Sequence, residues 1–240
     1  MRNSLALLLI LFLRTANGQD WRTASHEPAG LAPDPAATPE AVVQVYGART
    51  WGWRGSFGVH TWVAVKPANA AAYTVYEVIG WRLRWSDSAV VIHQRAADAR
   101  WYGSLPELYA ERRGAAAEAL IPRIDAAARS YPYAREYTAW PGPNSNTFTA
   151  WITRAVPELN VDLPPTAIGK DYIPGGIVGS APSGRGLQVS LGGLLALTAS
   201  GVEGLELNLL GLSFGVNPFD PALKLPLLGR LGPARQLDAP

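Results

Sequence analysis

The sequence has no cysteine, only three histidines and no block of consecutive lysine and arginine. The absence of cysteine excludes disulfides, a thiolate nucleophile, cysteine-ligated metals and a lipoprotein-type lipid anchor. Three scattered histidines are a poor ligand set, so we expect neither a metal nor another cofactor. A net charge of +2 over 240 residues gives too weak a field to favour nucleic acid, and we exclude that class of partner.

Charged side chains are also scarce. They make up 17% of the residues, against roughly 25% in typical soluble domains. Hydrophobic residues reach 48%, with 24 glycines and 20 prolines. This composition predicts a globular chain with a substantial core, many turns and a β-rich fold.

The N-terminal apolar run, residues 5–13, is shorter than the about 20 residues that a membrane-spanning helix needs. It follows a short positive start at Arg2 and precedes Ala16, Asn17 and Gly18, which are small residues suited to signal peptidase. We therefore predict that residues 1–18 are a signal peptide, or a short anchor, and that the protein is exported to the periplasm or cell envelope. An uncleaved anchor would bring peripheral association with the membrane.

Residues 19–40 are rich in proline and predict a linker. Alternation then predicts strands at 42–46, 57–66, 73–79, 81–85 and 89–93, and helical periodicity begins near 105 and resumes over 115–129, where Pro122 should kink or divide the helix. In the second strand His60 and Trp62 share one face. In the third, Glu77 is the single carboxylate of an apolar row and needs a partner.

The most informative stretch covers residues 139–152. Pro141, Gly142 and Pro143 mark a rigid turn, Asn144, Ser145 and Asn146 are good helix N-caps, and apolar residues then recur at helical spacing until Pro157. A hydroxyl at the start of a buried helix lies beside unpaired N–H groups and the positive end of the helix dipole. Ser145 is therefore a candidate nucleophile, although on local sequence alone we favour the interpretation of Ser145 and its asparagine neighbours as caps.

From residue 186 the pattern changes to leucine or valine alternating with polar residues, as in Leu187 to Leu191 and Leu205 to Leu209. This predicts an amphipathic antiparallel sheet. We assign 41–180 to a core domain, 181–228 to a β-rich C-terminal extension and 229–240 to a loose tail.

The residues suggest a catalytic triad in which Ser145 is the nucleophile, His60 the general base and Glu77 the group that orients the imidazole. The N–H groups of Asn146 and Thr147 would hold the oxyanion. The alternative is that His60 is an ordinary hydrogen-bonded histidine under the sheet.

The runs 140–148, 58–62 and 167–172 together resemble the bacterial family known as domain of unknown function 3750, which has no established activity. More distantly, Asn144, Ser145, Asn146, Thr147 and Phe148 are similar to the Asn-Cys-Glu-His-Phe box of the lecithin:retinol acyltransferase-like proteins. Those proteins belong to the circularly permuted NlpC/P60 branch of papain-like folds. The resemblance implies an α+β fold with a papain-like, circularly permuted NlpC/P60-type core, in which the histidine strand precedes the nucleophile helix.

The same resemblance places Ser145 at the nucleophile position, His60 at the base position and Glu77 at the third polar position, for which His93 competes. Serine where the family has cysteine removes the thiolate–imidazolium pair, so the chemistry is either that of a serine hydrolase or has been replaced by binding. The two resulting hypotheses are a cell-envelope hydrolase or acyltransferase acting on an amide or ester bond, and an inactive envelope-binding module for a glycan, peptide or lipid headgroup.

Further residues are candidates for substrate binding: Trp62, Asn144, Asn146, Thr147, Lys170 and Asp171. For Lys170 and Asp171 we favour a surface ion pair over a contact with substrate, because exposed pairs are common.

Overall fold

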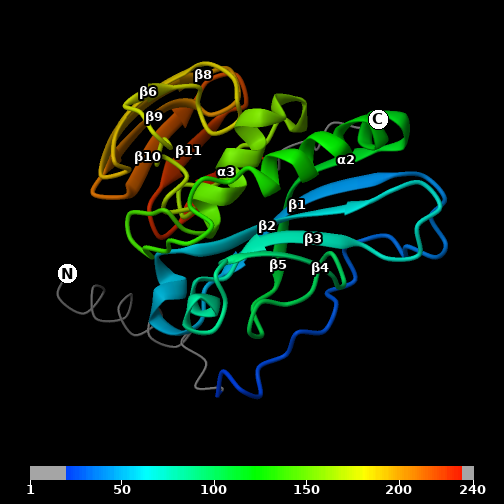
Figure 1. The fold of residues 1–240 in the computed structure, drawn as a ribbon. Coiled ribbons are helices and arrows are strands. Elements are labelled where there is room, and N and C mark those ends of the chain that lie inside the picture. Colours follow the sequence, from blue (N-terminus) through cyan, green and yellow to red (C-terminus); the bar gives the residue numbers. More distant parts are fainter. Residues whose placement is uncertain (1–19, 234–240) are drawn as a thin grey trace, which may run out of the picture.

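The computed structural model describes residues 20–233, which form an α+β fold of two antiparallel sheets and two α-helices (Figure 1). The first sheet has the strand order β4-β3-β2-β1-β5. Its strands are β1 Val42–Arg49, β2 Val59–Lys66, β3 Thr74–Val78, β4 Val90–Gln94 and β5 Pro106–Arg113. Helices α2 Gly114–Arg129 and α3 Ser145–Ala155 cover one face of it, and α3 lies between this sheet and the second one.

The second sheet has the order β12-β11-β10-β9-β8-β7-β6, so each strand pairs with its neighbour in the sequence. Its strands are β6 Val178–Gly179, β7 Leu187–Leu191, β8 Leu195–Ser200, β9 Gly204–Leu209, β10 Leu212–Asn217, β11 Ala222–Leu225 and β12 Gly229–Leu231. Three 3-10 helices complete the regular elements: η1 Gly52–Ser56, η2 Gly80–Arg84 and η3 Pro157–Leu159.

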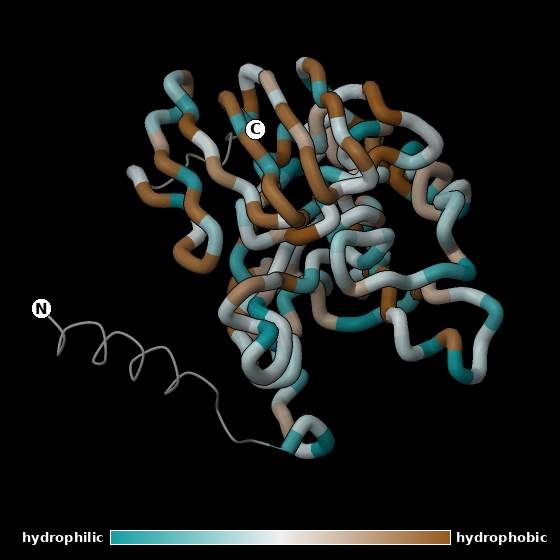
Figure 2. The backbone as a smooth tube through the Cα atoms, turned by 90° about the vertical axis from the view of Figure 1, so that its left-hand side faces the viewer, coloured by the Kyte–Doolittle hydropathy of each residue, from teal (hydrophilic) through white to brown (hydrophobic). Residues whose placement is uncertain are grey.

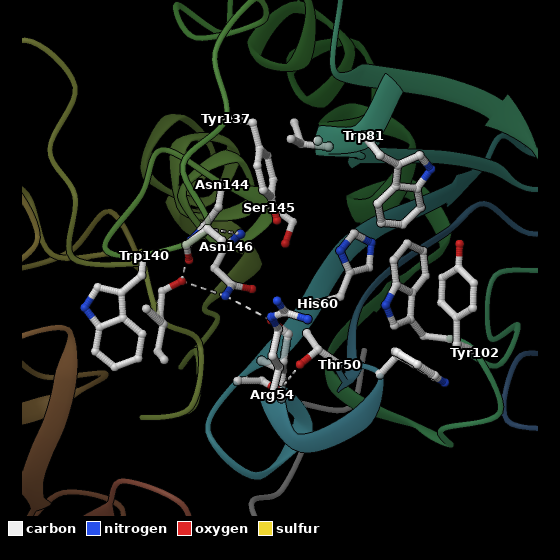
Figure 3. Close-up of a pocket in the computed structure, with 18 of the residues that line it drawn as sticks. Thr50, Arg54, His60, Trp81, Tyr102, Tyr137, Trp140, Asn144, Ser145 and Asn146 are labelled. Atoms are coloured by element: carbon white, nitrogen blue, oxygen red, sulfur yellow. Dashed lines mark hydrogen bonds between the residues drawn. The ribbon is translucent and has the colours of Figure 1, made fainter. Parts of the chain in front are cut away.

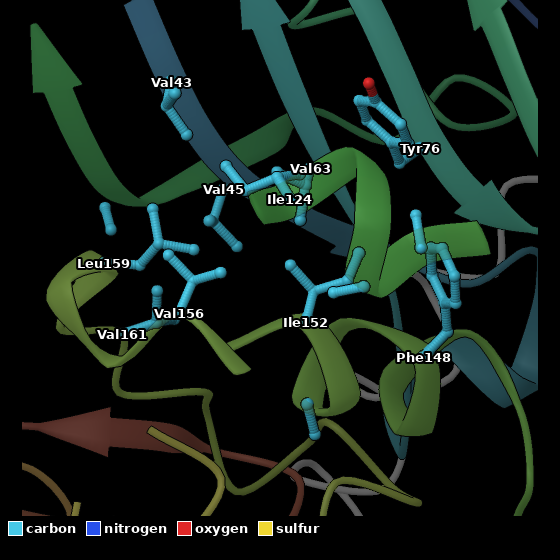
Figure 4. Close-up of a cluster of buried hydrophobic side chains, with 14 of the residues drawn as sticks. Val43, Val45, Val63, Tyr76, Ile124, Phe148, Ile152, Val156, Leu159 and Val161 are labelled. Carbon is cyan, nitrogen blue, oxygen red and sulfur yellow. The ribbon is translucent and has the colours of Figure 1, made fainter. Parts of the chain in front are cut away.

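The main core lies between the first sheet and the helices (Figure 4). Alternate residues of the central strands, such as Val45 and Val63, point toward the apolar stripe of α3, where Phe148 and Ile152 are fully buried. Burial of this kind stabilises by about 1.5–3 kcal/mol per side chain. The first turn of α3 is thereby held against β2.

Several expected elements differ from the structure. Residues 81–84 belong to η2 and Trp85 is its C-cap, so no strand forms here: these residues have no ladder partner, and Trp81 and Trp85 are exposed. The helical pattern near 105 belongs to β5, since pairing with β1 overrides local propensity. Pro122 does not divide α2, because its exposed ring lies on the solvent side.

The segment expected to be a linker is held against the first sheet. Leu31 and Ala32 donate backbone N–H groups to Asp98, and Tyr73 donates its hydroxyl to the Pro33 carbonyl. At the other end, β12 extends the sheet to residue 231, into the expected tail. The predicted signal peptide, 1–18, and residues 234–240 lie outside the described residues.

The second sheet carries its polar residues inward. Gln188, Thr198, Glu206 and Asn208 are buried, whereas the leucines that alternate with them are exposed. The inner face therefore packs through polar groups on the segment that follows α3. None of the helices within residues 20–233 has both the length and the hydropathy of a bilayer-spanning segment.

Candidate functional site

A cavity of about 1090 Å³ opens at the N-terminal end of α3. His60 and Ser145 both line it, and Figure 3 shows the Ser145 side chain directed toward the side where the His60 ring lies. The rest of the lining is strongly aromatic and includes seven tryptophans: Trp21, Trp51, Trp53, Trp81, Trp85, Trp101 and Trp140. The structure thus brings two of the three predicted catalytic residues to one apolar pocket.

The cap of α3 is Asn144, not Ser145. The Asn144 Oδ1 accepts the N–H groups of Asn146 and Thr147 at 2.9 and 3.2 Å, and the Thr147 hydroxyl accepts the Asn144 N–H in return. This reciprocal capping box satisfies the groups that sequence reasoning assigned to the oxyanion. The prediction that Asn146 and Thr147 supply oxyanion donors is therefore wrong.

Ser145 is left with unused hydrogen-bonding capacity. It is 4% exposed, yet neither its hydroxyl nor its backbone N–H bonds to any residue that the structure describes. Phe148, one turn later, donates to the Asn144 carbonyl, so the Ser145 N–H is the group of this first turn that remains available. Ser145 lines the cavity, so its hydroxyl is available to a ligand there.

The His60 ring is fixed from behind by Glu77. The distance from His60 Nε2 to Glu77 Oε2 is 2.8 Å, and the second Glu77 oxygen contacts His93 Nε2 at 2.9 Å and Arg95 Nε at 3.2 Å. Glu77 is thus the neighbour of His60, and His93 lies behind Glu77. Nδ1 of His60 forms no hydrogen bond with the described residues.

The charges of this group follow from its burial. Burial opposes the charged form of Glu77, but the hydrogen bonds from His60 and His93 and the charge of Arg95 outweigh it and hold the Glu77 pKa well below its usual range. Burial lowers the pKa of His60, with Glu77 acting in the opposite direction. Since an ionised Glu77 can only accept, Nε2 carries the proton and Nδ1 is a free base.

Trp101 stacks on the His60 ring, with centroids 3.6 Å apart and an interplanar angle of 12°. Sequence reasoning missed Trp101 and Arg95, because both follow β4 in irregular chain where no periodicity marks them. Trp62, predicted to bind substrate, is completely buried on the same face of β2 as His60, with ring centroids 5.8 Å apart, and donates to the Ala97 carbonyl. It does not line the pocket.

Asn146 and Thr147 fasten α3 to its surroundings. The Asn146 amide donates to the carbonyls of Val59 and Ile168, and the Thr147 hydroxyl donates to the Gly169 carbonyl. The Asn144 amide also donates to the Ile168 carbonyl. Asn144, Asn146 and Thr147, which were predicted to bind substrate, therefore stabilise the position of α3. Asn144 and Asn146 also line the pocket.

Lys170 and Asp171 are fully buried, so the preferred interpretation as a surface pair is wrong. Lys170 contacts Glu206 and Asp171, and Asp171 accepts hydrogen bonds from Asn208 and Ser213. Burial opposes the charge of Asp171, but Lys170 and these donors lower its pKa. Both residues lie beneath the second sheet, away from the pocket. No group of His, Asp or Glu side chains within residues 20–233 is arranged as a metal site.

The model of the family described as protein of unknown function (DUF3750) matches residues 40–172, more than half of the chain. No curated protein and no solved structure matches the sequence. The match includes the first sheet, both helices and the loop that fastens α3.

Proposed function

This chain belongs to the DUF3750 family, and we propose that its pocket is the active site of a hydrolase or acyltransferase that uses Ser145 to cleave an amide or ester bond. The observation that carries the proposal is the unbonded hydroxyl of Ser145, which shares an apolar cavity with a neutral, oriented histidine. Since Asn144 already caps the helix, a structural role does not account for the serine.

The chemistry would proceed through a covalent acyl-enzyme. The Ser145 Oγ attacks the carbonyl carbon while its proton passes to His60 Nδ1, and the Ser145 N–H donates to the developing oxyanion. The intermediate collapses by breaking the bond to the leaving alcohol or amine, which takes the proton from His60. Water, or an acceptor alcohol or amine, then attacks the ester by the same route in reverse and frees the serine.

Glu77 orients the base in this scheme. Its carboxylate accepts the Nε2 proton in a hydrogen bond with an Nε2–Oε2 distance of 2.8 Å, and it stabilises the imidazolium that forms during transfer. Trp101 restricts the ring to one plane by stacking. Glu77 would act on the rate through His60 without touching the substrate, whereas Trp101 also lines the cavity.

The finer fold assignment is part of the same proposal: a papain-like, circularly permuted NlpC/P60-type core. Its support is the order of the chain, in which the strand with His60 and the strand with Glu77 precede a helix that begins with the nucleophile and packs on an antiparallel sheet. We extend the proposal to location. The N-terminal sequence favours export to the cell envelope, and the substrate would be an envelope small molecule, peptide or lipid.

A fluorophosphonate probe tests the nucleophile directly, because it forms a covalent bond with an activated serine. We expect labelling at Ser145, identified by mass spectrometry of the tryptic peptide, and its loss in Ser145→Ala and His60→Ala. Thr50→Val is the matched control, since Thr50 is another hydroxyl residue lining the cavity. Turnover of p-nitrophenyl esters should follow the same pattern. Labelling elsewhere, or equal turnover by Ser145→Ala, would refute the proposal.

The aromatic lining favours one alternative, a binding module without catalysis. Trp53 and Trp85 are 66% and 67% exposed at the cavity, and such rings can stack on a sugar or a lipid headgroup. This function predicts that Ser145→Ala binds a ligand as the wild type does, while Trp53→Ala weakens binding. Quenching of tryptophan fluorescence by detergents or oligosaccharides measures both.

A further inference from the structure

The outer face of the second sheet is a continuous aliphatic surface, which we call the leucine face. Strand pairing aligns its side chains in rows, such as Val189, Leu197, Leu207 and Phe214 across four neighbouring strands. All four are at least 40% exposed. Figure 2, which views this side, shows hydrophobic positions recurring along the strands. The face is completed by Leu187, Leu191, Leu195, Leu205, Leu209, Val216, Leu223 and Leu231.

The leucine face carries almost no charge. From residue 187 to residue 223 the only ionisable side chains are Glu203, Glu206 and Asp220. Glu203 and Glu206 point inward and are buried, and Asp220 pairs with Arg230 beyond the end of the face. A dozen apolar side chains about half exposed amount to an area on the order of 1,000 Å², well above the few hundred Å² usual on a monomer.

Nothing in the sheet's own stability requires this arrangement. The polar side chains could have faced water and the leucines the protein, but the inner face is committed to the buried pairs with Lys170 and Asp171. Exposed aliphatic surface costs about 25 cal/mol per Å² relative to burial. We therefore expect a face of this size to be buried against another apolar surface.

The residue types of the leucine face indicate what kind of surface it binds. Protein interfaces are enriched in tyrosine, tryptophan, phenylalanine, methionine and arginine, and leucine and valine are under-represented among their key contacts. Of these five types the leucine face contains only one residue, Phe214, and the rest of the face is leucine and valine. A uniformly aliphatic surface without hydrogen-bonding groups matches acyl chains better than it matches another protein.

The face is also continuous with the pocket mouth. The turn between β9 and β10 lies against Trp140, where a Cβ on Gly211 would come within 3.2 Å of the indole. Trp140 lines the cavity and is 43% exposed. Arg49 reaches from the first sheet to the Leu227 carbonyl nearby. Tryptophan and arginine beside an aliphatic surface are the residues that favour the headgroup level of a membrane.

We propose that the leucine face docks on a lipid bilayer, with its aliphatic rows in the acyl region and the tryptophan-lined pocket mouth at the headgroup level. The association is peripheral and mainly hydrophobic, so it depends weakly on salt and on lipid charge. It stands independently of catalysis at Ser145, because none of the leucine-face residues lines the cavity.

Flotation with phosphatidylcholine vesicles tests the proposal on the full chain. We expect the wild type to float with vesicles at 0.15 M and equally at 1 M sodium chloride. Leu197→Thr combined with Leu207→Thr, which keeps β propensity, should reduce the partition coefficient about tenfold to hundredfold. The matched control is Leu31→Thr with Leu105→Thr, two leucines that are 49% and 61% exposed away from the second sheet. This control should float as the wild type does.

The variants share the N-terminal segment, so any contribution from it cancels in the comparison. A wild type that stays with the lipid-free fraction overturns the proposal, as does equal flotation of the two double variants. A lipid-free dimer that dissociates on Leu197→Thr with Leu207→Thr, seen by light scattering, also overturns it and assigns the face to a second copy. Thermal unfolding must show that both variants are folded; if the test variant is not, Leu197→Thr alone is used.

Discussion

The free hydroxyl of Ser145 leads to a prediction about stability that separates it from its neighbour Asn144. Ser145→Ala removes a group that makes no hydrogen bond within the described structure, so we expect the free energy of unfolding to change by less than about 0.5 kcal/mol. Asn144→Ala removes the cap, which costs about 1–2 kcal/mol. It also removes the donors to the Ala139 and Ile168 carbonyls, at about 1 kcal/mol each. The expected total is about 3–4 kcal/mol.

Urea unfolding followed by tryptophan fluorescence measures both variants, and equal slopes with denaturant would confirm that only stability differs. Activity should show the opposite order: Ser145→Ala is inactive but stable, and Asn144→Ala is destabilised but retains the reacting groups. If Ser145→Ala loses 1 kcal/mol or more and turnover is unaffected, the serine is a structural residue and our reasoning about the pocket fails.

Four further predictions concern the site and the buried network beneath the second sheet. Glu77→Gln should lower kcat/KM and move its acid limb to lower pH, because Glu77 opposes the burial that lowers the pKa of His60; a limb that moves upward contradicts this. Wild-type stability should fall as the pH drops below about 6.5, since unfolding lets His60 take up a proton. Gly169→Ala should lower the free energy of unfolding, measured in urea, by about 1–3 kcal/mol more than Gly175→Ala does. Both glycines have positive φ, but only at residue 169 would an added Cβ lie 2.5 Å from a side chain. Lys170→Ala should cost about 3–5 kcal/mol, because it leaves buried carboxylates unpaired, and a loss below 1 kcal/mol would argue against the buried network.

The elements that sequence reasoning located best are those whose packing is local. The helix from Ser145 is confirmed because turn residues, caps and apolar spacing all agree there. The strands at β1, β2, β3 and β4 are confirmed in the same way by alternation. Residues 106–113 could not be placed as a strand from the sequence. Their apolar residues recur at helical spacing, and the strand forms through pairing with β1.

The site was harder to predict than the fold. Local sequence left three residues as equivalent caps, and only the geometry shows that Asn144 takes the role and Ser145 is free. Alternation located the strands of the second sheet but not which face is inside. That choice depends on Lys170 and Asp171, which no local pattern connects to Glu206.

The buried pairs beneath the second sheet also bear on where this protein's folding unit ends. The family match stops at residue 172, directly after Lys170 and Asp171, and several of their partners lie further on, in β7, β9 and β10. The matched segment thus contains this pair of charges but lacks Glu206, which also contacts Lys170, and the Asn208 and Ser213 donors to Asp171. Melting the sheet would uncover them together, beside the Ile168 and Gly169 carbonyls that hold the start of α3. We therefore expect a single cooperative transition for the whole chain, and a sequence-defined domain whose stability is partly encoded downstream of it.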